Sequence, residues 1–239
     1  MQILFVHGGS HDENCWDHIK PYFSGGELNI HTITLCGHGS NRLHGYRVSM
    51  STYVQDVCCK AEQIGGPCVL VGHSMAGMVI SAAAEARPDL FCHLIYVAAM
   101  VPERKGSRLI TLATKYSNRE AKTIAKINFF SGTFSLDHNR VKEVFYNECE
   151  GISVQLAERY LCQQPIRPFL SSVKWTQDKL GSIAKDYIEC SLDKVMSIKD
   201  QRAMQKHMHF SRIKTLVSDH SPFISMPDKF FMCIAKLVK

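Results

Sequence analysis

Short apolar runs alternate with amphipathic segments over the first hundred residues of the chain, and again near its end. Runs rich in β-branched and other apolar residues predict buried strands, which we place at 2–6, 29–35, 69–71, 91–99, 183–190 and 211–217. Apolar residues at helical spacing predict helices at 12–23, 51–64, 78–86, 197–207 and 227–237. Strands that alternate with helices in this way imply a parallel sheet with right-handed crossovers.

The alternation stops at about Pro102 and does not resume before about Lys179. The intervening residues have the pattern of several short amphipathic helices joined by irregular links. We therefore expect an α/β core formed by residues 1–101 and 180–239, with residues 102–179 inserted as a helical cap.

A serine stands between the strand predicted at 69–71 and the helix predicted at 78–86, in the sequence Gly72-His73-Ser74-Met75-Ala76-Gly77. A strand, a tight turn with small residues and a helix form the nucleophile elbow of serine hydrolases, in which the serine hydroxyl is held exposed. The fifth position of the usual G-x-S-x-G pattern is Ala76, which still lets strand and helix approach. The alternative is a serine that only caps a helix.

A serine nucleophile needs a histidine base and an acid that orients the histidine. A helical block inserted after the strand that follows the elbow helix fits the α/β-hydrolase plan, in which these residues follow in the order Ser, Asp or Glu, His. Asp193 comes just after the strand predicted at 183–190, and His220 follows the last strand. Glu103 is the rival acid, and Asp193 could instead serve a helix N-terminus. We assign Asp219, beside the base, to the organisation of its loop.

The oxyanion of a tetrahedral intermediate needs two preorganised hydrogen-bond donors. The backbone N–H of Met75, next after the nucleophile, is one candidate, and that of Gly9, in the loop after the first strand, is the other. A tight turn without a catalytic task is the alternative for this loop.

The composition limits the class of protein, its cellular compartment and the need for a metal or cofactor. The 239 residues, 45% hydrophobic and 21% charged, indicate an ordinary globular domain, and no apolar run is long enough to span a bilayer. Scattered cysteines without a C-x-x-C pair favour reduced thiols and a cytoplasmic protein. Two pairs of histidines, His7 with His11 and His207 with His209, have spacings that a metal could use, but no cluster of carboxylates lies near them in sequence. We therefore expect no metal, and the proposed chemistry needs no cofactor.

The net charge of +6 arises mostly in residues 103–179, which carry 13 Lys/Arg and 8 Asp/Glu. A solvated helical surface explains this excess, and attraction of an anionic substrate or partner is the alternative. Basic residues are not interleaved with aromatic ones, so nucleic acid is an unsuitable partner.

The chain resembles the plant methyl-esterase and hydroxynitrile-lyase branch of the α/β-hydrolases, together with bacterial salicylate-esterase-like relatives. The resemblance rests on Phe-Val-His-Gly-Gly-Ser-His at 5–11, Gly-His-Ser-Met-Ala-Gly at 72–77 and Asp-His-Ser-Pro-Phe at 219–223. It implies the same triad of Ser74, Asp193 and His220. The lyases carry threonine and lysine where this chain has Gly8 and Ser221, which places it on the esterase side.

The sequence therefore predicts a serine carboxylic-ester hydrolase for small or medium esters, with methyl esters among them. The alternatives are a thioesterase or an enzyme for acyl groups on an anionic carrier protein, and a non-catalytic protein that binds small acids. We expect no membrane partner. The resemblance implies that the protein could form a homodimer, because dimers are common in that branch of the family. Five residues are candidates for the substrate pocket, with core packing as the alternative for the aromatic ones: Ser10, Phe129, Trp175, Ser221 and Phe223.

Overall fold

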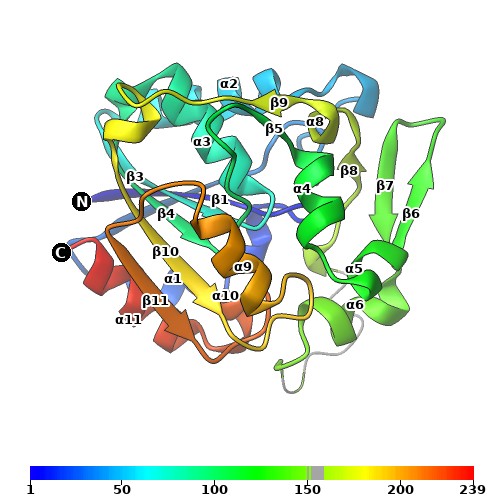
Figure 1. Cartoon of the computed structure of the whole chain (residues 1–239). Helices are drawn as coiled ribbons and strands as arrows, with labels where there is room; N and C mark the ends of the chain where they lie inside the picture. The colour runs from blue at the N-terminus through cyan, green and yellow to red at the C-terminus, as the bar shows by residue number, and fades with distance from the viewer. Residues whose placement is uncertain (150, 152–158) are drawn as a thin grey trace.

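The computed structural model describes residues 1–149, 151 and 159–239, and its centre is a parallel β-sheet (Figure 1). Within the described residues the sheet has six strands in the order β11-β10-β4-β3-β1-β2, and every neighbouring pair is parallel. The strands are β1 (Gln2–Val6), β2 (Asn29–Ile33), β3 (Cys68–His73), β4 (Phe91–Val97), β10 (Ala184–Cys190) and β11 (Arg212–Leu216). The prediction of a parallel sheet is confirmed, and each strand lies within a few residues of its predicted place.

Helices cover both sides of this sheet, with α2 and α3 above it and α1, α10 and α11 below it in Figure 1. This explains why the central strands are apolar almost throughout, since neither of their faces meets water. The helices and 3₁₀ turns of the core are η1 (Glu13–Trp16), α1 (Lys20–Phe23), η2 (Gly45–Arg47), α2 (Met50–Ile64), α3 (Ala76–Ala86), η3 (Pro88–Leu90), η4 (Leu180–Ser182), α9 (Ile198–Gln205), α10 (Pro222–Ser225) and α11 (Pro227–Leu237).

Local signals explain where most of these helices begin and end. In α2, the side chain of Ser49 accepts a hydrogen bond from the Thr52 backbone, and Gly65 closes the helix with φ of 89°. The helix predicted over 12–23 is instead divided into η1 and α1. Pro21, which lacks a backbone N–H, stands in the first turn of α1, where no donor is needed.

The segment between β4 and β10 contains the predicted cap, which lies at the carboxyl ends of the central strands (Figure 1). It contains short strands as well as helices, whereas the sequence pattern predicted helices alone. One cause is the hairpin of β6 and β7, which Gly132 helps to turn with φ of 66°. The elements are β5 (Ser107–Arg108), α4 (Leu109–Tyr116), α5 (Arg119–Thr123), β6 (Ala125–Asn128), β7 (Thr133–Leu136), α6 (His138–Phe145), β8 (Gln164–Pro165), α8 (Arg167–Leu170) and β9 (Ser172–Val173).

The turn between β3 and α3 depends on close backbone approach. A Cβ at Gly77 would lie 2.2 Å from the carbonyl oxygen of Met100, and one at Gly72 would lie 2.9 Å from Ile80. The glycines therefore let α3 pack against the strand ends on either side of Ser74.

We predict that Gly77→Ala lowers the free energy of unfolding by about 1–3 kcal/mol, because its methyl group would collide with a backbone oxygen that cannot swing away. Gly26→Ala is the matched control, since the nearest atom to a Cβ there is 4.0 Å away, and we expect a change within about 0.5 kcal/mol. Urea denaturation measures both variants. Equal stabilities would contradict the steric account of this turn.

Candidate active site

Ser74 lies at the tip of the turn between β3 and α3, with φ of 54°. Positive φ is uncommon for a residue with a side chain, and such strained conformations occur often at functional sites. The backbone is fixed by two hydrogen bonds, from Ser74 N to Val97 O at 3.1 Å and from Met100 N to Ser74 O at 3.0 Å. The turn thereby directs the Ser74 hydroxyl away from the sheet and into a cavity.

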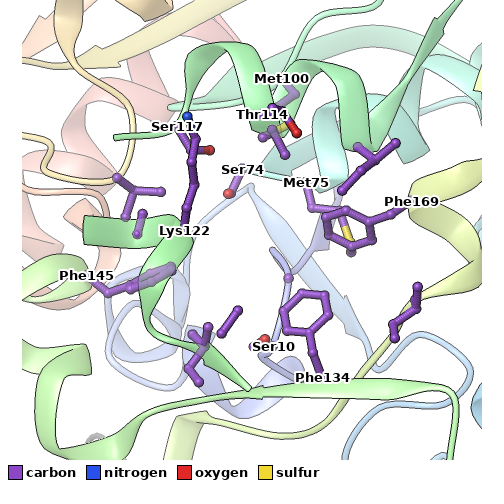
Figure 2. A pocket seen from close by; sticks show the side chains of 18 of the residues that line it. Ser10, Ser74, Met75, Met100, Thr114, Ser117, Lys122, Phe134, Phe145 and Phe169 are labelled. Atoms are coloured by element: carbon purple, nitrogen blue, oxygen red, sulfur yellow. The ribbon is translucent and has the colours of Figure 1, made fainter. Parts of the chain in front are cut away.

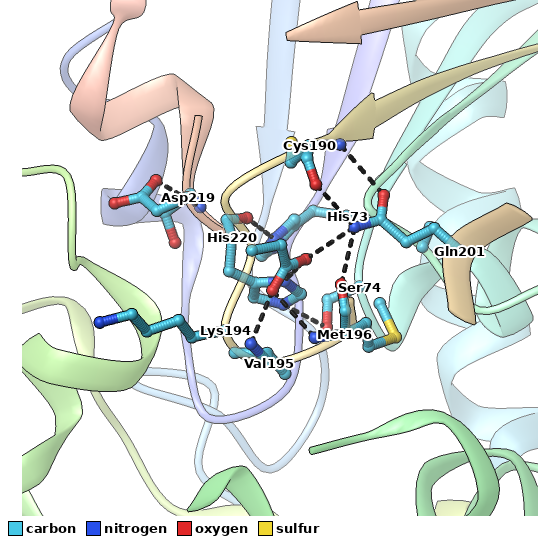
Figure 3. Close-up of polar contacts among 12 residues, drawn as sticks. His73, Ser74, Cys190, Lys194, Val195, Met196, Gln201, Asp219 and His220 are labelled. Atoms are coloured by element: carbon cyan, nitrogen blue, oxygen red, sulfur yellow. Dashed lines mark hydrogen bonds and ion pairs between the residues drawn. The ribbon is translucent and has the colours of Figure 1, made fainter. Parts of the chain in front are cut away.

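His220 lies beside this hydroxyl, with its Nε2 2.9 Å from Ser74 Oγ (Figure 3). Its other ring nitrogen, Nδ1, is 2.7 Å from Oδ2 of Asp193. The side chains of His220 and Asp193 are both fully buried. The structure thus brings together the three residues that chain order selected, in the connectivity that lets Ser74 lose a proton to His220.

Asp193 is held by donors from its own loop and from α9. Its Oδ1 accepts hydrogen bonds from the backbone N–H groups of Val195 and Met196, at 2.7 and 2.9 Å. Gln201 donates through Nε2 to Oδ2 at 3.1 Å, and its Oε1 accepts from the backbone N–H of Cys190. Together these donors hold the Asp193 carboxyl group in place beside His220. Gln201 is not among the residues predicted from sequence, because its only signal there is a polar residue on the inner face of the helix predicted over 197–207.

The two other acidic candidates lie elsewhere. Glu103 is 3.7 Å from Lys105 and 3.8 Å from His207, and it does not contact His220. Asp219 accepts hydrogen bonds from the Ser221 backbone and the Ser225 hydroxyl in its own loop, and from the Glu148 backbone in the cap. Burial raises the pKa of the Asp219 carboxyl. Asp219 therefore joins the His220 loop to the cap.

Both predicted oxyanion donors line the cavity beside Ser74. Gly9 and Met75 are neighbours, because a Cβ at Gly9 would lie 3.8 Å from that of Met75. Residues of the cap hold the Gly9 loop: Gln164 accepts a hydrogen bond from Ser10 N at 3.1 Å, and Cys162 N donates to Ser10 O at 2.8 Å. The cap thus helps to position one of the two donors.

Buried histidines support the same loop. Nδ1 of His7 is 2.8 Å from Gly8 O, that of His11 is 2.7 Å from Gly9 O, and that of His38 is 2.9 Å from His11 O. A carbonyl oxygen can only accept, so Nδ1 carries the proton in each case. Burial lowers the pKa of His7 and His11 to about 4, and that of His38 well below its usual range. These three rings are therefore neutral at neutral pH.

His73, next to the nucleophile, belongs to the same group. Its Nε2 donates to the backbone carbonyl oxygen of His220 at 2.8 Å, and burial lowers its pKa well below the usual range. The neutral His73 ring therefore places no positive charge beside His220.

The cavity in front of Ser74 has a volume of about 390 Å³ and walls that are mostly apolar (Figure 2). Of the five predicted pocket residues, only Ser10 lines it. Its Oγ is buried and has no hydrogen-bond partner among the described residues. The remaining lining residues come largely from the cap: Met100, Ile110, Ala113, Thr114, Ser117, Ala121, Lys122, Ala125, Ile127, Phe134, Leu136, Phe145, Ile166, Phe169 and Val195.

The other four predicted pocket residues lie outside this cavity. Phe129 is 77% exposed near the turn of the β6–β7 hairpin. Trp175 is buried and donates to the carbonyl oxygen of Pro102, beneath the start of the cap. Phe223 is fully buried against Trp16 and His73, behind the elbow. Ser221 begins α10, where its backbone bonds hold the loop of His220.

No cluster of three or more His, Cys, Asp or Glu side chains in the described part of the chain is arranged to hold a metal ion. Nor does any helix there have the length and apolar character needed to span a membrane.

The model of the α/β hydrolase family matches residues 3–232 of the chain. The chain is 25% identical over 248 residues to putative methylesterase 11 of Arabidopsis thaliana, covering 99% of this chain but only 64% of that protein. It is 27% identical over 245 residues to the pyrethroid hydrolase of Sphingobium wenxiniae, covering 98% of this chain and 86% of that protein.

Solved structures with the same fold include further hydrolases. The crystal structure of a pyrethroid hydrolase from Sphingobium faniae matches with a TM-score of 0.88 and 26% identity, covering 99% of this chain and 96% of that one. Polyneuridine aldehyde esterase matches with a TM-score of 0.87 at 20% identity, covering 100% of this chain and 99% of that one, which supports the fold alone.

We predict that stability falls as the pH drops below 6.5. His7, His11, His38 and His73 have depressed pKa values when folded, so unfolding takes up protons below the unfolded-state pKa of about 6.5. Stability is fully present above that pH and is lost towards pH 4. Each histidine should remove about 1 kcal/mol of unfolding free energy between about pH 6.5 and 5.5.

Urea denaturation at several pH values measures this slope. His38→Gln should flatten it, and replacement of the exposed His209 by Gln, the matched control, should leave it unchanged. An unfolding free energy that stays constant between about pH 6.5 and 5.5 would contradict the neutral buried histidines.

The matched family model, the parallel sheet and the place of the elbow within it agree, and we conclude that this chain belongs to the α/β hydrolase family.

Proposed function

We propose that this protein hydrolyses small or medium carboxylic esters by acyl transfer through Ser74. The observation that carries this proposal is the hydrogen-bonded line from Ser74 Oγ through His220 to Asp193, with distances of 2.9 and 2.7 Å, at the wall of an apolar cavity. The relatives include proteins named methylesterase, pyrethroid hydrolase and methyl jasmonate esterase, and the chain is a carboxylesterase-type hydrolase.

The geometry supports a two-step reaction. Ser74 Oγ attacks the ester carbonyl carbon while His220 Nε2 takes the hydroxyl proton, and Asp193 stabilises the resulting imidazolium. The N–H groups of Gly9 and Met75 stabilise the oxyanion. His220 then gives its proton to the departing alcohol, which leaves an acyl group on Ser74. Water, deprotonated by His220, attacks this acyl group, and the acid is released.

The volume and lining of the cavity support the substrate class. A cavity of about 390 Å³ with mostly apolar walls suits a ligand of drug-like size or smaller. Methyl esters fall within this range, and we include them among the proposed substrates.

The environment of Gly8 supports hydrolysis over the cyanohydrin cleavage of the lyases in the resembling branch. Those lyases have threonine at this position. Here a Cβ at Gly8 would lie 2.7 Å from His73 Nδ1 and 3.0 Å from the Cβ of Ser74. A threonine therefore does not fit unless the ring of His73, next to Ser74, shifts.

We also propose that the protein works in the cytoplasm. All ten cysteines are free thiols, and burial raises the pKa of several, among them Cys15 and Cys190. Protonated, unpaired thiols suit a reducing compartment.

The test is hydrolysis of a panel of p-nitrophenyl and methyl esters, with thioesters of the same acyl groups alongside. We expect oxygen esters to be hydrolysed, and Ser74→Ala to lower kcat/KM by at least about 10³-fold because the acyl acceptor is lost. Asp193→Asn should lower it by about 10²–10⁴-fold, because the base loses its tautomer.

Ser24→Ala, which changes an exposed serine, is the matched control and should behave as wild type. Equal activity of Ser74→Ala and wild type would contradict the mechanism. Turnover of thioesters alone would favour the carrier-linked alternative, and tight binding of acids without any turnover would favour a binding protein.

A further inference from the structure

Among the described residues that line the cavity, Lys122 is the only one that carries a charge. It belongs to α5, a short helix that begins at Arg119, soon after α4 ends at Tyr116. The backbone N–H of Lys122 donates to the carbonyl oxygen of Asn118 at 3.3 Å. The Lys122 side chain is exposed, and it lies at the edge of the cavity into which the Ser74 hydroxyl points (Figure 2). Among the described lining residues it therefore carries the one charge that a bound ester could meet.

Neighbouring cations of the cap have partners within the protein. Lys126 is 2.9 Å from Asp137, and Lys115 lies over the ring of Tyr116 at 4.7 Å. By contrast, the ammonium group of Lys122 has no hydrogen bond or ion pair within residues 1–149, 151 and 159–239. It is therefore available to a ligand in the cavity.

Two hydroxyl-bearing side chains of the lining lie near Lys122, and a third, that of Ser10, lies beside Phe134 (Figure 2). Thr114 and Ser117 of the α4 end lie on the same side of the cavity as Lys122, whereas Phe134 and Phe169 lie on the opposite side (Figure 2). One ammonium and two hydroxyl groups form a donor set for an anion, and the aromatic wall suits a carbon chain.

We infer that the preferred substrates are esters that carry an anionic group, such as half-esters of dicarboxylic acids, and that Lys122 selects them. This inference rests on the proposed ester hydrolysis at Ser74. Because the Lys122 side chain is exposed, water screens the attraction between its ammonium group and a carboxylate, which leaves the modest strength of an ion pair at the protein surface. The aliphatic chain between the ester and the carboxylate then lies along the apolar wall.

The experiment compares pairs of esters that have the same shape and different charge. One pair is mono-p-nitrophenyl adipate and p-nitrophenyl 6-methylheptanoate, in which an isopropyl group replaces the carboxylate; glutarate and pimelate pairs vary the chain length. The measured quantity is the ratio of kcat/KM for the anionic ester to that for the neutral one, after subtraction of the rate with Ser74→Ala.

We expect wild type to favour the anionic ester of the best pair by about two- to fivefold, as the strength of a solvent-exposed ion pair allows. Lys122→Met should bring this ratio close to one, and Lys122→Glu should reverse the preference. Lys126→Met is the matched control: it removes the same charge four residues away, outside the cavity lining, and should leave the ratio unchanged.

A wild-type ratio near one for every pair, or a ratio that Lys122→Met and Lys126→Met lower equally, would overturn the inference. In both cases continued turnover of the neutral esters would leave the proposed function intact. Absence of turnover for all esters, neutral and anionic, would instead overturn the proposed function and this inference with it.

Discussion

The hydrogen bond between Ser74 and His220 depends on the strained turn at the end of β3, and the other parts of the site are arranged around it. A positive φ at Ser74 is maintained because β3, β4 and α3 surround the turn, with glycines where their backbones approach. Asp193 and His220 follow β10 and β11, whose carboxyl ends lie at the same edge of the sheet. The parallel sheet therefore brings Ser74 next to His220, which is 146 positions away in sequence.

A second group of interactions joins the core to the cap. Gln164 and Cys162 hold the loop of Gly9, and Asp219 binds the backbone of Glu148 beside the loop of His220. Neutral buried histidines bind the carbonyl groups of the same oxyanion loop. The cap thus does more than cover the cavity, since it contacts both the loop of Gly9, the predicted oxyanion donor, and the loop of His220, the predicted base.

Much of the core could be predicted from sequence, because strands buried on both faces have an unmistakable apolar pattern and the chain order of the triad follows from the sheet. The residues that form the apolar wall of the cavity in front of Ser74 could not be predicted in this way. Phe223 and Trp175 are aromatic like Phe134 and Phe169, but only tertiary packing decides which rings face a cavity. Gln164 lies far in sequence from the loop that it holds, and Gln201 is only eight residues from Asp193, but a polar residue in a helix does not by itself indicate a contact with that carboxylate. The cap strands were missed because they are too short to alternate clearly.

The central claim is that Ser74 is a nucleophile activated by His220. Labelling with a fluorophosphonate, followed by peptide mass spectrometry, tests it most directly because it needs no knowledge of the substrate. The account predicts phosphonylation of Ser74 in wild type, and labelling slowed by at least about 10²-fold in His220→Ala, where no base accepts the hydroxyl proton. Label on another residue, or equal labelling rates in the two proteins, would contradict it.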